Sequence, residues 1–171
     1  MKIALMILAV VAAFILIVVA IGYSLPVQHR VSREATFAAP ADSVFAIITD
    51  IEKFPAWRKG LTRVERVSPP GAEPSGALQY REVGGDGDIL YSVDESEPPT
   101  RLVTRIADKS LPFGGRWTYA LTPATNGGTT LRITEDGEVY NPLFRFMSKY
   151  VFGHNRTIDN YLRDLRARVD G

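Results

Sequence analysis

The chain opens with an unbroken apolar segment and then changes to short alternating patterns. From Ile3 to Gly22 every residue is apolar or glycine. A helix of about 20 residues rises about 30 Å, which matches the hydrocarbon core of a bilayer. The pattern therefore predicts one membrane-spanning helix near the N-terminus.

A cleaved secretory signal is the alternative for this segment, because Ala20-Ile21-Gly22 resembles a small-x-small cleavage site. The apolar run is longer than the signal-peptide core of about 7 to 15 residues, which favours a retained single-pass anchor. Tyr23 sits where an interfacial aromatic residue would, and Pro26 ends the helical tendency. Lys2 precedes the segment and Arg30 follows it, so loop charges hardly decide the orientation. We prefer a signal anchor with the domain outside the cytoplasm.

The rest of the chain is predicted to be a short linker and one domain. We assign residues 1–25 to the anchor, 26–30 to the linker and 31–171 to the domain. Apolar alternation from Val31 to Phe37 predicts a first strand, whereas Val44 to Ile51 follow helical spacing. The domain therefore starts with a strand and a helix.

Alternating positions return between Leu61 and Val139 and predict about five further strands. Turn residues separate these strands, at Pro69-Pro70-Gly71, Gly84-Gly85-Asp86-Gly87, Pro98-Pro99, Pro112-Phe113-Gly114-Gly115 and Asn126-Gly127-Gly128. The short connections favour antiparallel neighbours.

A long C-terminal helix is predicted to follow, with Asn141 as N-cap and Pro142 as its first residue. Apolar residues recur every three or four positions along it, and His154 fills the one gap. The stripe consists of Leu143, Met147, Val151, Ile158, Leu162, Leu165 and Val169. Such a stripe must be buried, and the concave side of the sheet is the surface large enough to cover it.

Several motifs resemble the helix-grip fold of the START-like SRPBCC superfamily, over about residues 31–170. They are Ala38-Ala39-Pro40-Ala41-Asp42-Ser43-Val44-Phe45, Asp50, Phe54-Pro55-Ala56-Trp57, Gly137-Glu138-Val139 and Asn141-Pro142. The resemblance implies an α+β fold in which a curved antiparallel sheet grips the C-terminal helix, with a hydrophobic cavity between them. The superfamily includes lipid-transfer and polyketide cyclase/dehydrase-like proteins, so the resemblance is more specific for the fold than for one activity.

The amino-acid composition excludes several kinds of functional site. The 171 residues allow one ordinary domain plus a small appendage. Zero Cys and two His exclude a disulfide framework, a thiolate nucleophile and a Cys- or His-rich metal site, so we expect neither metal nor cofactor. The formal net charge is +1, and Lys2 is the only charged residue before Arg30. The domain is therefore neutral, which argues against a nucleic-acid partner.

The candidate ligand-binding residues are those whose position in the strand or helix pattern directs them toward the predicted cavity. The aromatic candidates are Tyr80, Tyr91, Trp117 and Tyr119, which offer apolar area with a polar group but could equally be plain core. Glu135 follows Leu131 and Ile133 in strand phase, and Glu82 follows Tyr80 in the same way. Turned inward, either carboxylate is a candidate polar anchor or proton donor. Near a strand end, each could instead meet water.

The helix stripe adds Met147 and His154 to these candidates. An imidazole facing a cavity could hydrogen-bond a ligand or act as a general base, or it could be a satisfied core histidine. His29 lies in the predicted linker, and we expect no specific role for it.

Together these patterns predict a membrane-tethered module that binds a lipid or other small hydrophobic molecule. The alternative is an enzyme of the cyclase, dehydrase or hydrolase type that uses His154 or Glu135 to move protons in the same cavity. A third reading is a scaffold that contacts another membrane protein. No catalytic residue and no protein partner can be assigned from the sequence.

Overall fold

A computed structural model describes residues 2–67, 78–85, 87–125, 127–153 and 155–171. The helical elements are α1 (Lys2–Ser24), α2 (Ala41–Thr49), the 3-10 turn η1 (Ile51–Lys53), α3 (Phe54–Trp57), α4 (Pro142–Met147), the π-helical turn η2 (Ser148–Phe152) and α5 (Arg156–Val169). The strands are β1 (Gln28–Phe37), β2 (Leu61–Arg66), β3 (Gln79–Gly84), β4 (Gly87–Glu97), β5 (Arg101–Ile106), β6 (Phe113–Pro123) and β7 (Thr129–Val139).

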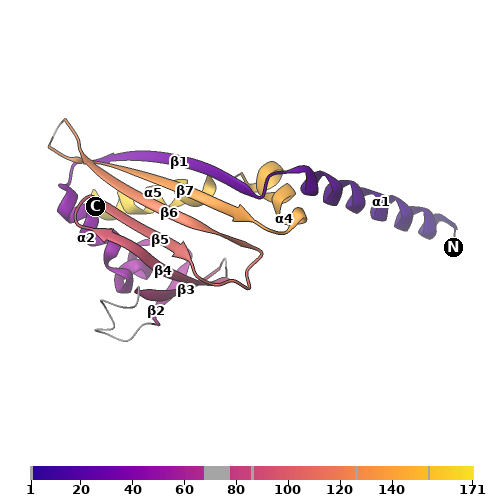
Figure 1. Cartoon of the computed structure of the whole chain (residues 1–171), viewed down its shortest axis with the longest axis horizontal. Coiled ribbons are helices and arrows are strands. Elements are labelled where there is room, and N and C mark those ends of the chain that lie inside the picture. The colour runs from indigo at the N-terminus through magenta and orange to yellow at the C-terminus, as the bar shows by residue number, and fades with distance from the viewer. Residues whose placement is uncertain (1, 68–77, 86, 126, 154) are drawn as a thin grey trace.

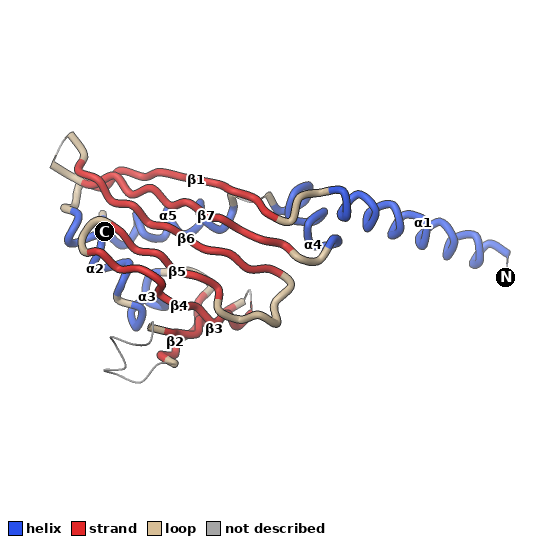
Figure 2. Tube along the Cα trace, in the orientation of Figure 1, coloured by secondary structure: helices blue, strands red, loops and turns tan. Residues whose placement is uncertain are grey.

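The strands form one antiparallel sheet of seven strands, in the order β1-β7-β6-β5-β4-β3-β2. Each strand from β2 to β7 pairs with its sequence neighbour, and β1 pairs with β7 from Gln28↔Glu138 to Phe37↔Thr129. Register shifts at Val93/Glu95 in β4 and at Leu61/Arg63 in β2 add to the bending of the sheet. Helices α2, α3 and α5 cover one face of it, while α1 extends away from the domain (Figures 1 and 2). The expected α+β helix-grip fold is confirmed.

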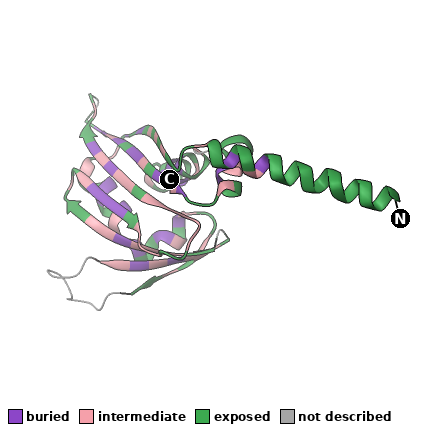
Figure 3. Cartoon of the chain, turned by 45° about the vertical axis from the view of Figure 1, so that its right-hand side comes forward, coloured by how far each residue is buried: buried purple, intermediate pink, exposed green. Residues whose placement is uncertain are grey.

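The core lies between the inner face of the sheet and α5. Leu131 and Ile133 of β7 and Ile158 and Leu165 of α5 are fully buried and belong to one cluster with Phe37 of β1. In Figure 3 the buried positions alternate along the strands, as expected for a sheet with one covered face. Burial of this helix face holds α5 against the concave sheet.

The start of the first strand and the number of strands differ from the sequence prediction. Strand β1 begins at Gln28, ahead of Val31, so the predicted linker is partly strand. The extra residues are in the sheet because β7 continues to Val139 and pairs with them. The first strand is followed by six others rather than five, and β2 is the strand whose pattern is weakest, because only Leu61 and Val64 are apolar and neither is fully buried.

The single long C-terminal helix was a wrong prediction, because the segment is divided into α4, η2 and α5. Asn141 does cap the first piece, and its Oδ1 accepts hydrogen bonds from the backbone N–H groups of Leu143 (2.9 Å) and Phe144 (3.3 Å). Between η2 and α5, Gly153 has a φ of +74°, which a residue with a side chain rarely adopts. Of these three pieces, α5 is the one whose apolar face is buried against the sheet, and Leu143 and Val151 of the predicted stripe are exposed.

The C-terminal end of α1 is joined to α4 by close contacts (Figure 1). A Cβ atom added at Gly22 would lie 2.0 Å from the carbonyl oxygen of Pro142, so only glycine allows this approach. The buried Arg145 donates from Nη1 to the carbonyl oxygen of Leu25 at 2.8 Å, and its guanidinium lies 6.0 Å from the ring centre of Tyr23. Helix α1 is long and apolar enough to cross a membrane, a test that a signal sequence also passes.

Candidate functional site

The aromatic candidates share the inner face of the sheet. Tyr80 of β3 and Tyr91 of β4 are register partners and stack with ring centres 5.5 Å apart. Trp117 and Tyr119 occupy successive inner positions of β6, with ring centres 6.1 Å apart. Tyr80 and Tyr119 are buried, while Tyr91 and Trp117 are half-buried. The sheet thus presents an aromatic surface toward α5.

Tyr161 of α5 connects this surface to the helices. Its ring centre lies 5.4 Å from that of Trp57, 5.7 Å from that of Tyr119 and 5.9 Å from that of Trp117. The hydroxyls of Tyr161 and Tyr119 are hydrogen-bonded, and Tyr119 is also hydrogen-bonded to Thr104. Tyr161 was not among the predicted site residues, although it lies three residues after Ile158 on the buried stripe.

A buried ion pair lies beside these rings. Arg58, just after α3, makes a bidentate contact with Glu82 of β3, through Nη1 to Oε1 and through Nη2 to Oε2 at 3.0 Å. Its guanidinium lies over the rings of Phe54 and Tyr161, 5.1 and 5.2 Å from their centres. Burial lowers the pKa of Arg58, but the charge and hydrogen bonds of Glu82 raise it by more, so the guanidinium stays charged. Arg58 was not among the predicted site residues, because a charged residue at the end of a short helix is typical of a solvent-exposed position.

The tyrosines around this ion pair are held in their neutral form. Burial raises the pKa of Tyr80, Tyr91, Tyr119 and Tyr161, and the negative charge of Glu82 raises it further. Their hydroxyls therefore keep their protons at physiological pH. They can act as hydrogen-bond donors to a buried group.

This environment predicts a loss of stability at alkaline pH. A tyrosine whose pKa is higher in the folded state stabilises the fold fully below the unfolded value of about 10, and the contribution is lost as the pH rises above it. We expect the free energy of unfolding to fall above pH about 10, with these four tyrosines ionising only as the chain unfolds. Tyrosinate absorbance and tryptophan fluorescence, followed in one pH titration, would measure this. Ionisation of these tyrosines while the fluorescence is still native would contradict it.

Glu135 and His29 form a second polar pair on the inner face. Glu135 lies opposite Trp117 of β6 and Val31 of β1, on the same face as Ile133. Its Oε1 lies 3.3 Å from His29 Nε2, and the two side chains are 18% and 17% exposed. Its Oε2 is buried and has no hydrogen-bond partner among the described residues. The pair thus presents a polar acceptor to the interior.

His29 was missed because it was assigned to the linker. If the strand alternation that includes Val31 is extended two residues toward the N-terminus, it places His29 on the inner face. The backbone also makes room for it, because a Cβ atom at Gly137 would lie 2.3 Å from the imidazole ring. The close packing of the ring across β7 depends on a glycine in the neighbouring strand.

The predicted site residue Met147 is not brought to this face. Met147 is half-buried in α4, which packs against α1 and the end of β7. His154 lies outside the described residues. Trp57 of α3 has a buried Nε1 with no hydrogen-bond partner among the described residues. Across the same residues, no three potential metal ligands come together.

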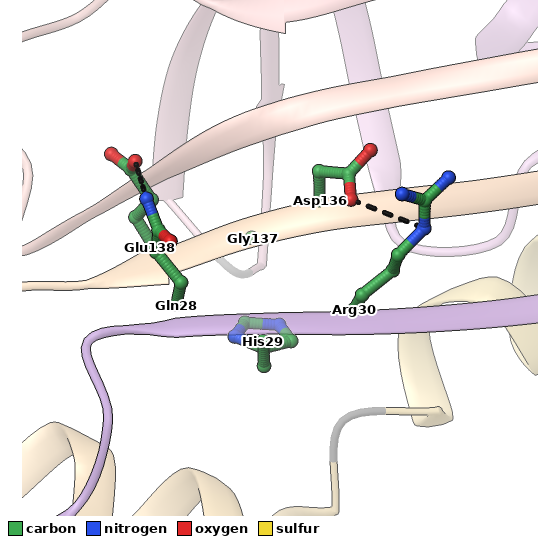
Figure 4. A pocket seen from close by; sticks show the side chains of 6 residues that line it. All are labelled: Gln28, His29, Arg30, Asp136, Gly137 and Glu138. Atoms are coloured by element: carbon green, nitrogen blue, oxygen red, sulfur yellow. Dashed lines mark hydrogen bonds and ion pairs between the residues drawn. The ribbon is translucent and has the colours of Figure 1, made fainter.

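A separate open depression of about 370 Å³ lies over β1 and β7. Figure 4 shows its two polar pairs, Gln28 with Glu138 at 3.3 Å and Arg30 with Asp136 at 3.4 Å. Neighbouring strand residues face opposite sides, so Gln28 and Arg30 lie on the outer side and the His29 ring on the inner side. None of the predicted ligand-binding residues lines this depression. His29 and Gly137 complete its lining, so the depression borders the His29–Glu135 pair but none of the aromatic candidates.

Comparison with known proteins gives one family match in sequence. The family described as polyketide cyclase / dehydrase and lipid transport matches residues 28–170. No curated protein matches the sequence significantly. The match includes every strand and all helices after α1.

Solved structures show the same fold at low sequence identity. A START superfamily protein from Mycobacterium smegmatis has a TM-score of 0.65 and 18% identity, over 83% of this chain and 97% of that one. A protein from Thermus thermophilus has a TM-score of 0.67 and 21% identity, over 82% and 97%. A norcoclaurine synthase from Thalictrum has a TM-score of 0.65 and 9% identity, over 84% and 94%. These likenesses establish the fold.

Proposed function

Because the chain belongs to the polyketide cyclase/dehydrase and lipid transport family, we propose that its domain binds a lipid or other small hydrophobic molecule between the sheet and α5. We propose further that α1 holds the domain at a membrane. Tethering raises the effective concentration of the domain at the bilayer, where such molecules reside. The family alone leaves open whether the domain binds or transforms its ligand.

The observation that carries the binding proposal is the aromatic inner face with its unpaired polar atoms. Tyr91 and Trp117 lie on the inner face of the sheet, packed against the core, and are only half-buried. Glu135 Oε2 and Trp57 Nε1 are buried without a partner among the described residues. Leaving such an atom unpaired costs about 1–3 kcal/mol. A ligand with one polar end and an apolar body would satisfy such an atom while covering the rings, as in most small-molecule sites.

Photo-crosslinking would test this proposal. We expect a photoactivatable lipid, supplied in phosphatidylcholine vesicles holding the full chain, to label β4 and β6 near Tyr91 and Trp117 as well as α1. Replacement of Glu135 by Gln removes the charge of the polar anchor and is expected to reduce labelling of β4 and β6 about tenfold, since a hydrogen bond to a charged group contributes about 1.5–3 kcal/mol.

Asp136→Asn is the matched control, because Asp136 is the next residue on the same strand and faces the opposite side. Its labelling should equal that of the unaltered chain. Labelling confined to α1 would contradict the binding site. Equal labelling of Glu135→Gln would contradict the role of Glu135.

An enzymatic function is the second candidate, favoured by the 3.3 Å contact between His29 Nε2 and Glu135 Oε1. A carboxylate that orients an imidazole can support general acid–base chemistry. The His29–Glu135 pair would have the proton-transfer role that the sequence suggested for His154 or Glu135 acting singly. The two functions differ in the fate of the molecule: an enzyme would release a product of altered structure, and His29→Ala and Glu135→Gln would each abolish that change. A binding module would release its ligand unchanged.

A further inference from the structure

The segment formed by α4 and η2 exposes apolar and aromatic side chains beside the end of α1. Leu143, Phe144, Tyr150 and Val151 are between 44% and 57% exposed. Phe146 and Tyr150 pack together with ring centres 5.0 Å apart. Because Gly153 separates this segment from α5, it does not share the buried position of α5 on the sheet. Its apolar side chains therefore need another cover.

The contact with α1 sets the depth of this segment relative to a bilayer. The apolar part of α1 ends at Gly22, and a helix of that length, about 30 Å, places Gly22 at the edge of the hydrocarbon core. Pro142 packs directly on Gly22, and Arg145 holds the carbonyl oxygen of Leu25. Helix α4 therefore starts at the boundary between the hydrocarbon and the headgroups.

The side chains near the end of α1 are of the types that are found at the boundary between hydrocarbon and headgroups. Tyr23, Tyr140 and Tyr150 are all exposed at this level of the structure, and tyrosine is enriched at membrane interfaces. The Nζ of Lys149 lies 5.5 Å from the ring centre of Tyr150. A lysine on such a segment can cover apolar surface with its methylene chain while its ammonium reaches the headgroups. The chemistry favours a lipid surface over a protein partner.

We propose that α4 and η2 form an interfacial membrane segment that docks the domain on the bilayer where α1 leaves it. The inference rests on the proposed function, since α1 must lie in a membrane. This docking turns one end of the sheet toward the lipids, because β1 starts just after α1 and β7 ends just before α4 (Figure 1). His29 and Glu135 lie at that end. A lipid that leaves the bilayer beside this segment meets their polar pair first.

Site-specific fluorescence tests this docking, and the chain suits it because it has no cysteine. The full chain is reconstituted in phosphatidylcholine vesicles with or without brominated acyl chains. Single variants Phe144→Cys and Val151→Cys carry an environment-sensitive label. Phe14→Cys reports on α1, and Thr122→Cys, exposed at the far end of β6, is the control. We expect severalfold stronger quenching by brominated lipid at 144 and 151 than at 122.

The outcomes separate this inference from the proposed anchor. Quenching at 14 without quenching at 144 and 151 overturns the docking and leaves the anchor intact. Lack of quenching at 14 overturns both. A blue-shifted emission at 144 and 151 that brominated lipid does not quench would indicate a protein partner and overturn the docking.

A second variant tests the contact that sets the depth. Gly22→Ala places a Cβ against the Pro142 carbonyl and forces α4 to move. We expect it to reduce quenching at 144 severalfold while quenching at 14 stays unchanged. Unchanged quenching at 144 would overturn the argument that α1 sets the depth of α4.

Discussion

Replacing Arg58 by Met is expected to lower the free energy of unfolding by about 3–5 kcal/mol, because the change leaves Glu82 buried without its cation. The Glu82 side chain is 7% exposed, so water cannot replace the lost partner. The guanidinium also lies over two aromatic rings, and its loss removes those contacts. Since a domain is stable by about 5–15 kcal/mol, this single change would remove a large share of the stability. Chemical denaturation of the full chain in detergent, followed by tryptophan fluorescence, would measure it.

The control for this prediction is the exposed pair of Lys53 and Asp50, whose side chains are 71% and 36% exposed. Lys53→Met should change the free energy of unfolding by less than about 1 kcal/mol. Adding Glu82→Leu to Arg58→Met should restore part of the loss, because no unpaired charge then remains buried. If Arg58→Met and Lys53→Met had equal effects, the buried pair would not have the importance assigned to it.

Replacing Leu165 by Ala is expected to lower the free energy of unfolding by about 2–5 kcal/mol, because it opens a cavity in a close-packed core. Leu165 of α5 is fully buried against the sheet. Leu143→Ala on α4 removes the same atoms from a residue that is 44% exposed, and its effect should stay within about 0.5 kcal/mol. The two variants differ only in where the fold places the leucine. The same denaturation experiment in detergent would compare them.

This comparison also tests the division of the C-terminal segment. A single continuous helix on the sheet, as the periodicity predicted, would bury both leucines and give similar losses. Equal effects would therefore contradict the separation of α4 from α5. The exposed position of Leu143 also makes it available to the bilayer in the proposed docking.

Much of the fold could be predicted because its signals are local. The strand alternation, the turn residues and the cap at Asn141 each act through neighbouring residues, and the family motifs agreed with them. The division of the C-terminal helix was missed because the stripe runs through Gly153 with little change in period. Helical periodicity shows that a face is apolar, but it does not show what covers that face.

The candidate site was only partly predictable for the same reason. Strand phase made Glu82 and Glu135 candidates for the inner face but left open that each meets water at a strand end, and the structure places both on the inner face. Their partners come from distant positions in the chain, Arg58 after α3 and His29 at the start of β1. No spacing in the sequence connects these residues, because the pairs form only when the sheet brings α3 and β1 to them.

By itself, the sequence determined the apolar N-terminal helix, the antiparallel strands, the family and the aromatic character of the inner face. These properties depend on hydrophobicity, backbone preferences and short-range periodicity, which each segment carries alone. The tertiary structure decided which charges are paired, which leucines are buried and where α4 lies. Those outcomes depend on contacts between segments far apart in the chain, such as Gly22 with Pro142, whose energies exist only in the assembled fold.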